Sequence, residues 1–175
     1  SWSARVTFDP TPNWSSQISI GELHDPEGAA HGDVRRTTAS VSYSRKTTIG
    51  QLDSSVIFGR NETSGDHAHD VNSWLAESVL QFGGRNYVTG RAEIVDKDEL
   101  FEGADVPHSI EHGVFQIKAL TLGYTRDLLT TRTFTGALGG NVTLYSIPEE
   151  IEPYYGEDLR SLYLFFRVRM GNHAM

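Results

Sequence analysis

Apolar and polar residues alternate along most of this chain with a period of two, the pattern that indicates β-strands with two different faces. From residue 2 to 9, for example, Trp2, Val6 and Phe8 fall on one face and polar residues on the other. The pattern predicts nine strands, at residues 2–9, 14–22, 36–45, 51–61, 71–82, 87–96, 115–127, 133–147 and 161–170. Most are about ten residues long, enough to cross a bilayer at a tilt and longer than the roughly five or six residues of ordinary strands.

The connections between these strands alternate strictly between short and long. The short ones are residues 10–13, 46–50, 83–86 and 128–132, and the long ones are 23–35, 62–70, 97–114 and 148–160. Outer-membrane barrels have short periplasmic turns and longer extracellular loops. We therefore expect an all-β fold, an antiparallel up-and-down transmembrane β-barrel over residues 1–170, with extracellular long loops and a periplasmic C-terminal tail at 171–175.

The strand count is odd, and the first predicted strand begins at the extracellular end. Bacterial single-chain barrels have an even number of strands with both termini in the periplasm. We therefore expect the nine strands to be part of a larger, even-stranded barrel, completed by further strands upstream or by a partner protein.

Aromatic residues fall near the ends of the predicted strands, as the interfacial girdles of a membrane barrel require. The pattern assigns Phe8, Trp14, Tyr43, Phe82, Tyr124 and Phe134 to the periplasmic side, and Trp2, Phe58, Trp74 and Tyr145 to the outer side. The alternative is that these rings fill the core of a soluble protein.

The last predicted strand is rich in aromatic residues, with the sequence Leu162-Tyr163-Leu164-Phe165-Phe166-Arg167-Val168-Arg169-Met170. Together with the strand and loop patterns, it resembles the outer-membrane porin-like proteins. The resemblance implies contact with the lipid of a bacterial outer membrane and passive passage of small solutes or ions. Two alternatives stay open: a non-conducting outer-membrane barrel that anchors or scaffolds a partner, and a soluble β-sandwich or lipocalin-like binding protein.

Charged residues occur on the polar faces of the predicted strands: Arg5, Asp53, Glu77, Arg91, Glu93, Arg167 and Arg169. We expect them to line the lumen, because an arginine facing lipid at mid-membrane costs about 2–4 kcal/mol. A register that pairs Phe82 with Val88 would set Glu77 opposite Glu93 and diagonal to Arg91, within reach of a long side chain. These charges would either tune ion selectivity or form salt bridges that plug a narrow barrel.

Histidines gather in three of the predicted long loops, each of which also carries acidic residues. They are His24, His31, His67, His69, His108 and His112. Imidazole and carboxylate groups together suit Zn²⁺, Cu²⁺ or Ni²⁺, and His67 and His69 would share one face of an extended segment. The loops would therefore bind a transition metal, act as a pH-sensing gate, or be solvated polar loops. No other cofactor is expected.

Other classes of function find little support in the residue content. The absence of cysteine excludes thiolate metal sites and a cysteine nucleophile. The net charge of −8 disfavours nucleic-acid binding, which usually needs a basic stripe. No apolar run approaches the roughly 20 residues of a membrane helix. A Gly-x-Ser-x-Gly motif is absent and no histidine lies in a predicted strand, so we do not expect an enzyme.

Overall fold

The computed structural model describes residues 1–24, 32–64, 69–98, 100–101, 106–107, 110 and 113–170. Within this part the chain forms nine strands and one helical turn, α2 (Glu152–Tyr155). The strands are β1 (Trp2–Thr11), β2 (Trp14–Leu23), β3 (Val34–Lys46), β4 (Gly50–Thr63), β5 (Asp70–Phe82), β6 (Asn86–Lys97), β7 (Phe115–Thr130), β8 (Phe134–Ser146) and β9 (Arg160–Met170). Every predicted strand is confirmed, with ends displaced by no more than three residues. The predicted tail at 171–175 lies outside the described residues.

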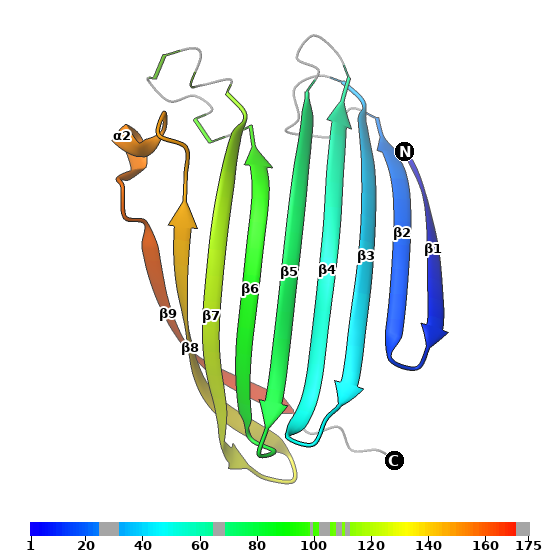
Figure 1. Cartoon of the computed structure of the whole chain (residues 1–175), viewed down its shortest axis with the longest axis vertical. Coiled ribbons are helices and arrows are strands. Elements are labelled where there is room, and N and C mark those ends of the chain that lie inside the picture. Colours follow the sequence, from blue (N-terminus) through cyan, green and yellow to red (C-terminus); the bar gives the residue numbers. More distant parts are fainter. Residues whose placement is uncertain are drawn as a thin grey trace.

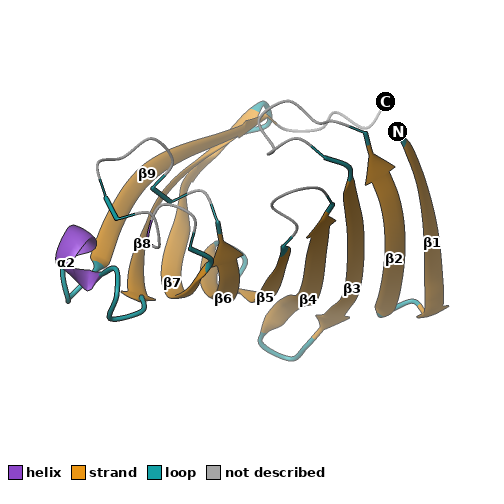
Figure 2. Ribbon diagram, turned by 90° about the horizontal axis from the view of Figure 1, so that it is seen from above, coloured by secondary structure: helices purple, strands orange, loops and turns teal. Residues whose placement is uncertain are grey.

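All nine strands belong to one sheet, in which each strand pairs antiparallel with the next along the chain (Figure 1). The predicted all-β, up-and-down arrangement is therefore confirmed. The short turns lie at one end of the sheet and the long loops at the other (Figure 1). We call these the short-turn end and the long-loop end. The sheet is a curved single layer whose edges, β1 and β9, are not joined (Figure 2).

The sheet curls most strongly over β7 to β9, and the contacts show which face is inside the curl. Arg169 of β9 reaches across β8 and β7 and donates a hydrogen bond, 3.2 Å long, to the hydroxyl of Tyr87 in β6. On the same face Thr125 is 5% exposed and Ala137 is fully buried. We call the face that carries Tyr87 and Arg169 the concave face, and the opposite one the convex face.

The convex face is apolar and uncovered. Its exposed side chains include Val6, Ile18, Val56, Trp74, Leu122, Leu162, Leu164 and Phe166, of which Leu164 is 72% exposed. The strand register places these residues side by side, so they form one continuous band across the sheet. Soluble domains bury the apolar face of a sheet against a second layer, and the described elements provide no such layer here.

Buried apolar residues cluster instead beneath two of the long loops. Phe101, Phe115 and Ile151 pack together, and the ring of Phe101 makes an edge contact with Tyr154 of α2, with centroids 5.2 Å apart. This small cluster joins the β6–β7 and β8–β9 connections at the long-loop end. No helix among the described residues is long and apolar enough to cross a membrane.

One detail of the sequence-based prediction is wrong, the register of one hairpin. In the β5–β6 hairpin Leu80, not Phe82, pairs with Val88, so Glu77 lies opposite Arg91 and not opposite Glu93. The observed and predicted registers of this hairpin differ by two residues. Such a shift keeps every side chain on the same face of the sheet, so the alternation of polar and apolar residues cannot distinguish the two registers. The turn decides the register: Phe82 pairs with Asn86 across a loop that uses Gly83 and Gly84 at φ +55° and +72°.

Tyr145, which the sequence assigned to the outer side, lies near the long-loop end of β8. It pairs with Ala119 on the concave face. Its neighbour Leu144 pairs with Leu120 on the convex face. The strict alternation of side chains along β8 therefore excludes Tyr145 from a convex girdle.

Candidate functional site on the concave face

The concave face carries all seven charged residues that the sequence assigned to the lumen. The register puts Arg5, Asp53, Glu77, Arg91, Glu93, Arg167 and Arg169 on this one face. They do not form a single cluster. The structure brings together one group on β5 and β6 and a second group on β6, β7 and β9, while Arg5 and Asp53 lie on β1 and β4.

The first group lies midway along β5 and β6. Glu77 and Arg91 are direct cross-strand partners, and Arg91 forms an ion pair with Glu93, with Nη2 2.8 Å from Oε1. The hydroxyl of Ser55 in β4 donates a 3.2 Å hydrogen bond to Glu77 Oε1. These groups are partly exposed, so the pairs contribute about 1 kcal/mol or less to stability. Their effect is to fix charge on the concave wall.

The second group centres on Asp127, whose side chain is only 6% exposed. Its Oδ2 accepts hydrogen bonds from Arg169, at 2.8 Å, and from the Tyr87 hydroxyl, at 3.1 Å. Its Oδ1 lies 3.6 Å from Nη2 of Arg167. A buried carboxylate is tolerated only when it is paired or hydrogen-bonded, and here two cations and a phenol surround it. The group ties β9 to β6 and β7 near the short-turn end.

A hollow of about 620 Å³ opens on the other half of the concave face. Its walls include Asp9, Asn13, Ser42, Ser44, Asp53 and Glu77. Ser44 donates a hydrogen bond to Asp53, and Gln51 donates to both. The hydroxyls, amides and carboxylates share the walls of the hollow with Pro12, Trp14, Tyr43 and Val79. What this surface offers chemically is hydrogen bonding and charge for a hydrated solute.

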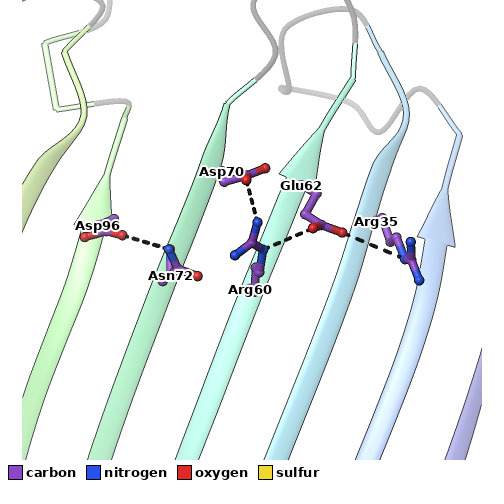
Figure 3. Close-up of polar contacts among 6 residues, drawn as sticks. All are labelled: Arg35, Arg60, Glu62, Asp70, Asn72 and Asp96. Carbon is purple, nitrogen blue, oxygen red and sulfur yellow. Dashed lines mark hydrogen bonds and ion pairs between the residues drawn. The ribbon is translucent and has the colours of Figure 1, made fainter.

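A second row of charges lies on the convex face, where the apolar band ends at the long-loop end (Figure 3). Arg60 contacts Asp70 at 2.5 Å and Glu62 at 3.1 Å, and Arg35 lies 3.9 Å from Glu62. Further along the row Asn72 donates hydrogen bonds to Asp96. We call these six residues the charged row. The row crosses β3 to β6 and continues the face that carries Phe58 and Trp74.

The histidines divide into those that the structure describes and those that it does not. His31, His67, His108 and His112 lie outside the described residues. His69 contacts the carboxylate of Asp98. His24 lies 3.0 Å from Asp33, between Nδ1 and Oδ1, and Glu22 is close enough to share a metal ion with both.

Sequence reasoning missed Asp127, Tyr87 and the charged row as functional candidates. Asp127 ends the strand predicted at 115–127 and has the same parity as Thr125, so the alternation already put it on the polar face. The charged row had a weaker signal, because Arg60, Glu62 and Asp70 fall on the apolar face of their strands. The available signal was the change from apolar to charged residues at the end of the apolar face of β4 and β5.

No protein-family model, curated protein or solved structure matches this chain. The functional assignment therefore rests on the geometry of the sheet and of its two faces.

Proposed function

We propose that the chain forms part of the wall of a porin-like β-barrel in a bacterial outer membrane, where it allows passive passage of small solutes or ions. One observation carries the proposal: a single-layer antiparallel sheet has an exposed apolar convex face and a polar, charged concave face. A membrane barrel needs this arrangement, since lipid contacts the outer face and water fills the lumen.

The dimensions of the apolar band support a membrane location. Along β5 the convex face runs from Trp74 to Phe82, about 26 Å at about 3.3 Å per residue, or about 20 Å if the strand tilts by about 40°. The known apolar bands are about 25 Å tall. The charged row limits the band at the long-loop end, and Asn86, bonded to the Tyr124 hydroxyl at 2.7 Å, limits it at the other.

The orientation and the closure of the barrel are parts of the same proposal. The long-loop end faces the outside of the cell and the short-turn end faces the periplasm. With nine strands, β1 and β9 run in the same direction and cannot pair antiparallel with each other. Further strands or a partner protein would join β1 to β9. Neither edge strand pairs with a second strand of the nine, so both edges are open to such pairing.

Conductance in planar bilayers tests the proposal directly. The assembled barrel, extracted in detergent together with the strands or partner protein that join β1 and β9, should produce discrete conductance steps when it inserts. Ser54 and Ser55 are adjacent in β4 and face opposite sides of the sheet, which makes Ser54→Cys and Ser55→Cys a matched pair in a chain without cysteine. A cationic thiol reagent should alter the current of Ser55→Cys and leave that of Ser54→Cys unchanged. A response from Ser54→Cys alone would contradict the assignment of the faces.

A second candidate function is a non-conducting barrel that anchors or scaffolds a partner. The observation that favours it is the crowding of the concave face under β7 to β9. A Cβ built on Gly139 would lie only 2.5 Å from Cζ of Phe165, so the Phe165 ring lies directly over this glycine. The Asp127 group bridges β9 and β6 on the same part of the concave face. A protein that inserts into bilayers without conductance would support this candidate. A chain that stays folded and monodisperse without detergent would instead favour a soluble binding protein.

A further inference from the structure

Three metal-ligating side chains meet on the convex side of the long-loop end, outside the concave site. Glu22 lies near the end of β2, His24 just after it, and Asp33 directly before β3. Their nearest ligand atoms all lie within 4.8 Å of one another. We propose that Glu22, His24 and Asp33 form a binding site for a divalent transition metal such as Zn²⁺, Cu²⁺ or Ni²⁺.

The strand register positions the three ligands. Glu22 pairs with Arg35 and Leu23 with Val34, so the same register sets His24 opposite Asp33. The imidazole Nδ1 of His24 lies 3.0 Å from Asp33 Oδ1. The ligands therefore stand at the two ends of a connection, where β2 and β3 hold them.

Hydrogen bonds to neighbouring strands hold the backbone and one carboxylate of the site. The backbone of Asp33 exchanges three hydrogen bonds of 2.8 to 3.1 Å with Ser64, which follows β4. The indole Nε1 of Trp2 in β1 donates a 2.8 Å hydrogen bond to Glu22 Oε2. An outer-shell donor of this kind orients a carboxylate ligand.

The donor set and its charge suit a divalent ion. Metal–ligand bonds of about 2.0–2.2 Å put two ligands of one ion about 3–4.4 Å apart, so small side-chain rotations bring all three donors into range. One imidazole and two carboxylates favour Zn²⁺, Ni²⁺ or Cu²⁺ over Ca²⁺ or Mg²⁺, which prefer oxygen ligands alone. The two carboxylates balance the charge of the ion. Arg35, the cross-strand partner of Glu22, lies 3.9 Å from Glu62 of β4.

Calorimetry with Zn²⁺ and fluorescence with Cu²⁺ test the site in the full chain, refolded in detergent and freed of metal by chelation. Zn²⁺ should bind with a stoichiometry of one at this site. Glu22→Gln, His24→Ala and Asp33→Asn should each weaken binding at least about tenfold, since loss of an outer-shell partner alone costs about 10–100-fold. All three side chains are at the surface, so the variants should keep the far-ultraviolet circular dichroism of the parent.

Two control variants make the result specific. His69→Ala removes a histidine at the same end of the sheet, which contacts Asp98, and should leave Zn²⁺ binding to the Glu22 site unchanged. Trp2→Phe should abolish the part of the Cu²⁺ quenching of fluorescence that arises from Trp2. Binding of Zn²⁺ in the calorimeter should persist, weakened at most by loss of the Trp2–Glu22 hydrogen bond. Equal Zn²⁺ affinity in His24→Ala and the parent, or absence of binding to the folded parent, would overturn the site.

Discussion

At the scale of single residues, Gly50 is the glycine with least room for a side chain among those of the described residues. A Cβ built on Gly50 would lie 1.7 Å from the backbone oxygen of Gln81, because β4 begins here directly beside the end of β5. Backbone atoms cannot rotate away as a side chain can. The close approach of the two strands therefore requires glycine.

We expect Gly50→Ala to lower the free energy of unfolding by about 1–3 kcal/mol, the usual cost of overpacking that shifts a backbone. The matched control is Gly90→Ala in β6, where the new Cβ would meet only Leu122 Cδ2 at 3.9 Å. Urea unfolding of the refolded chains, followed by tryptophan fluorescence, gives the comparison. Equal stability of the two variants would mean that the contact between the start of β4 and the end of β5 is looser than the structure shows.

At the scale of the elements, the register of the β5–β6 hairpin determines which charges meet. Glu77 faces Arg91 directly, so opposite charges are partners and Glu93 lies diagonally. In the register predicted from the sequence, two carboxylates would have faced each other. The turn glycines therefore decide the electrostatics of this part of the concave face.

Paired cysteines distinguish the two registers. Directly opposite residues have Cα atoms about 4.5–5.5 Å apart, whereas diagonal ones are about 7–8 Å apart, beyond the roughly 7 Å that a disulfide spans. Mild oxidation should therefore cross-link Glu77→Cys with Arg91→Cys much faster than Glu77→Cys with Glu93→Cys, as measured by gel mobility without reductant. The chain has no other cysteine to compete. The opposite preference would restore the register predicted from the sequence.

At the scale of the whole molecule, the contrast between the two faces is the main property of the sheet. Val41 lies on the convex face opposite Val56 and is 44% exposed. Its neighbour Ser40 lies on the concave face opposite Gln17 and Ile57. Val41 and Ser40 therefore report on the convex and the concave face at the same position along the strand axis.

If lipid covers the convex face, Val41→Arg should lower the stability of the folded chain in phospholipid vesicles by about 2–4 kcal/mol, the cost of arginine at mid-membrane. Ser40→Arg should change it by less than about 1 kcal/mol, because the concave face is polar. Urea titration of the vesicle-refolded variants measures both. Greater loss from Ser40→Arg would show that the concave face is the drier one.

The alternation of polar and apolar residues is enough to predict the nine strands, their up-and-down order and the face of the side chains within them. The physical reason is that side chains alternate strictly along a strand, so the polarity pattern reports the face. The alternation of short and long connections followed from the same reading. Even the parity of Asp127 and of the charged row was present in the pattern.

Which residues on one face meet depends on strand register and sheet curvature, and these are visible in the folded molecule alone. Registers that differ by two residues have the same polarity pattern, so the partner of Glu77 depended on backbone conformation at Gly83 and Gly84. The curl of β7 to β9 brought Arg169 to Tyr87 across two strands, a contact between residues far apart in the chain. The meeting of Glu22, His24 and Asp33 likewise required the β2–β3 register. Local alternation carries no information about curvature or long-range pairing, and these determine both candidate sites.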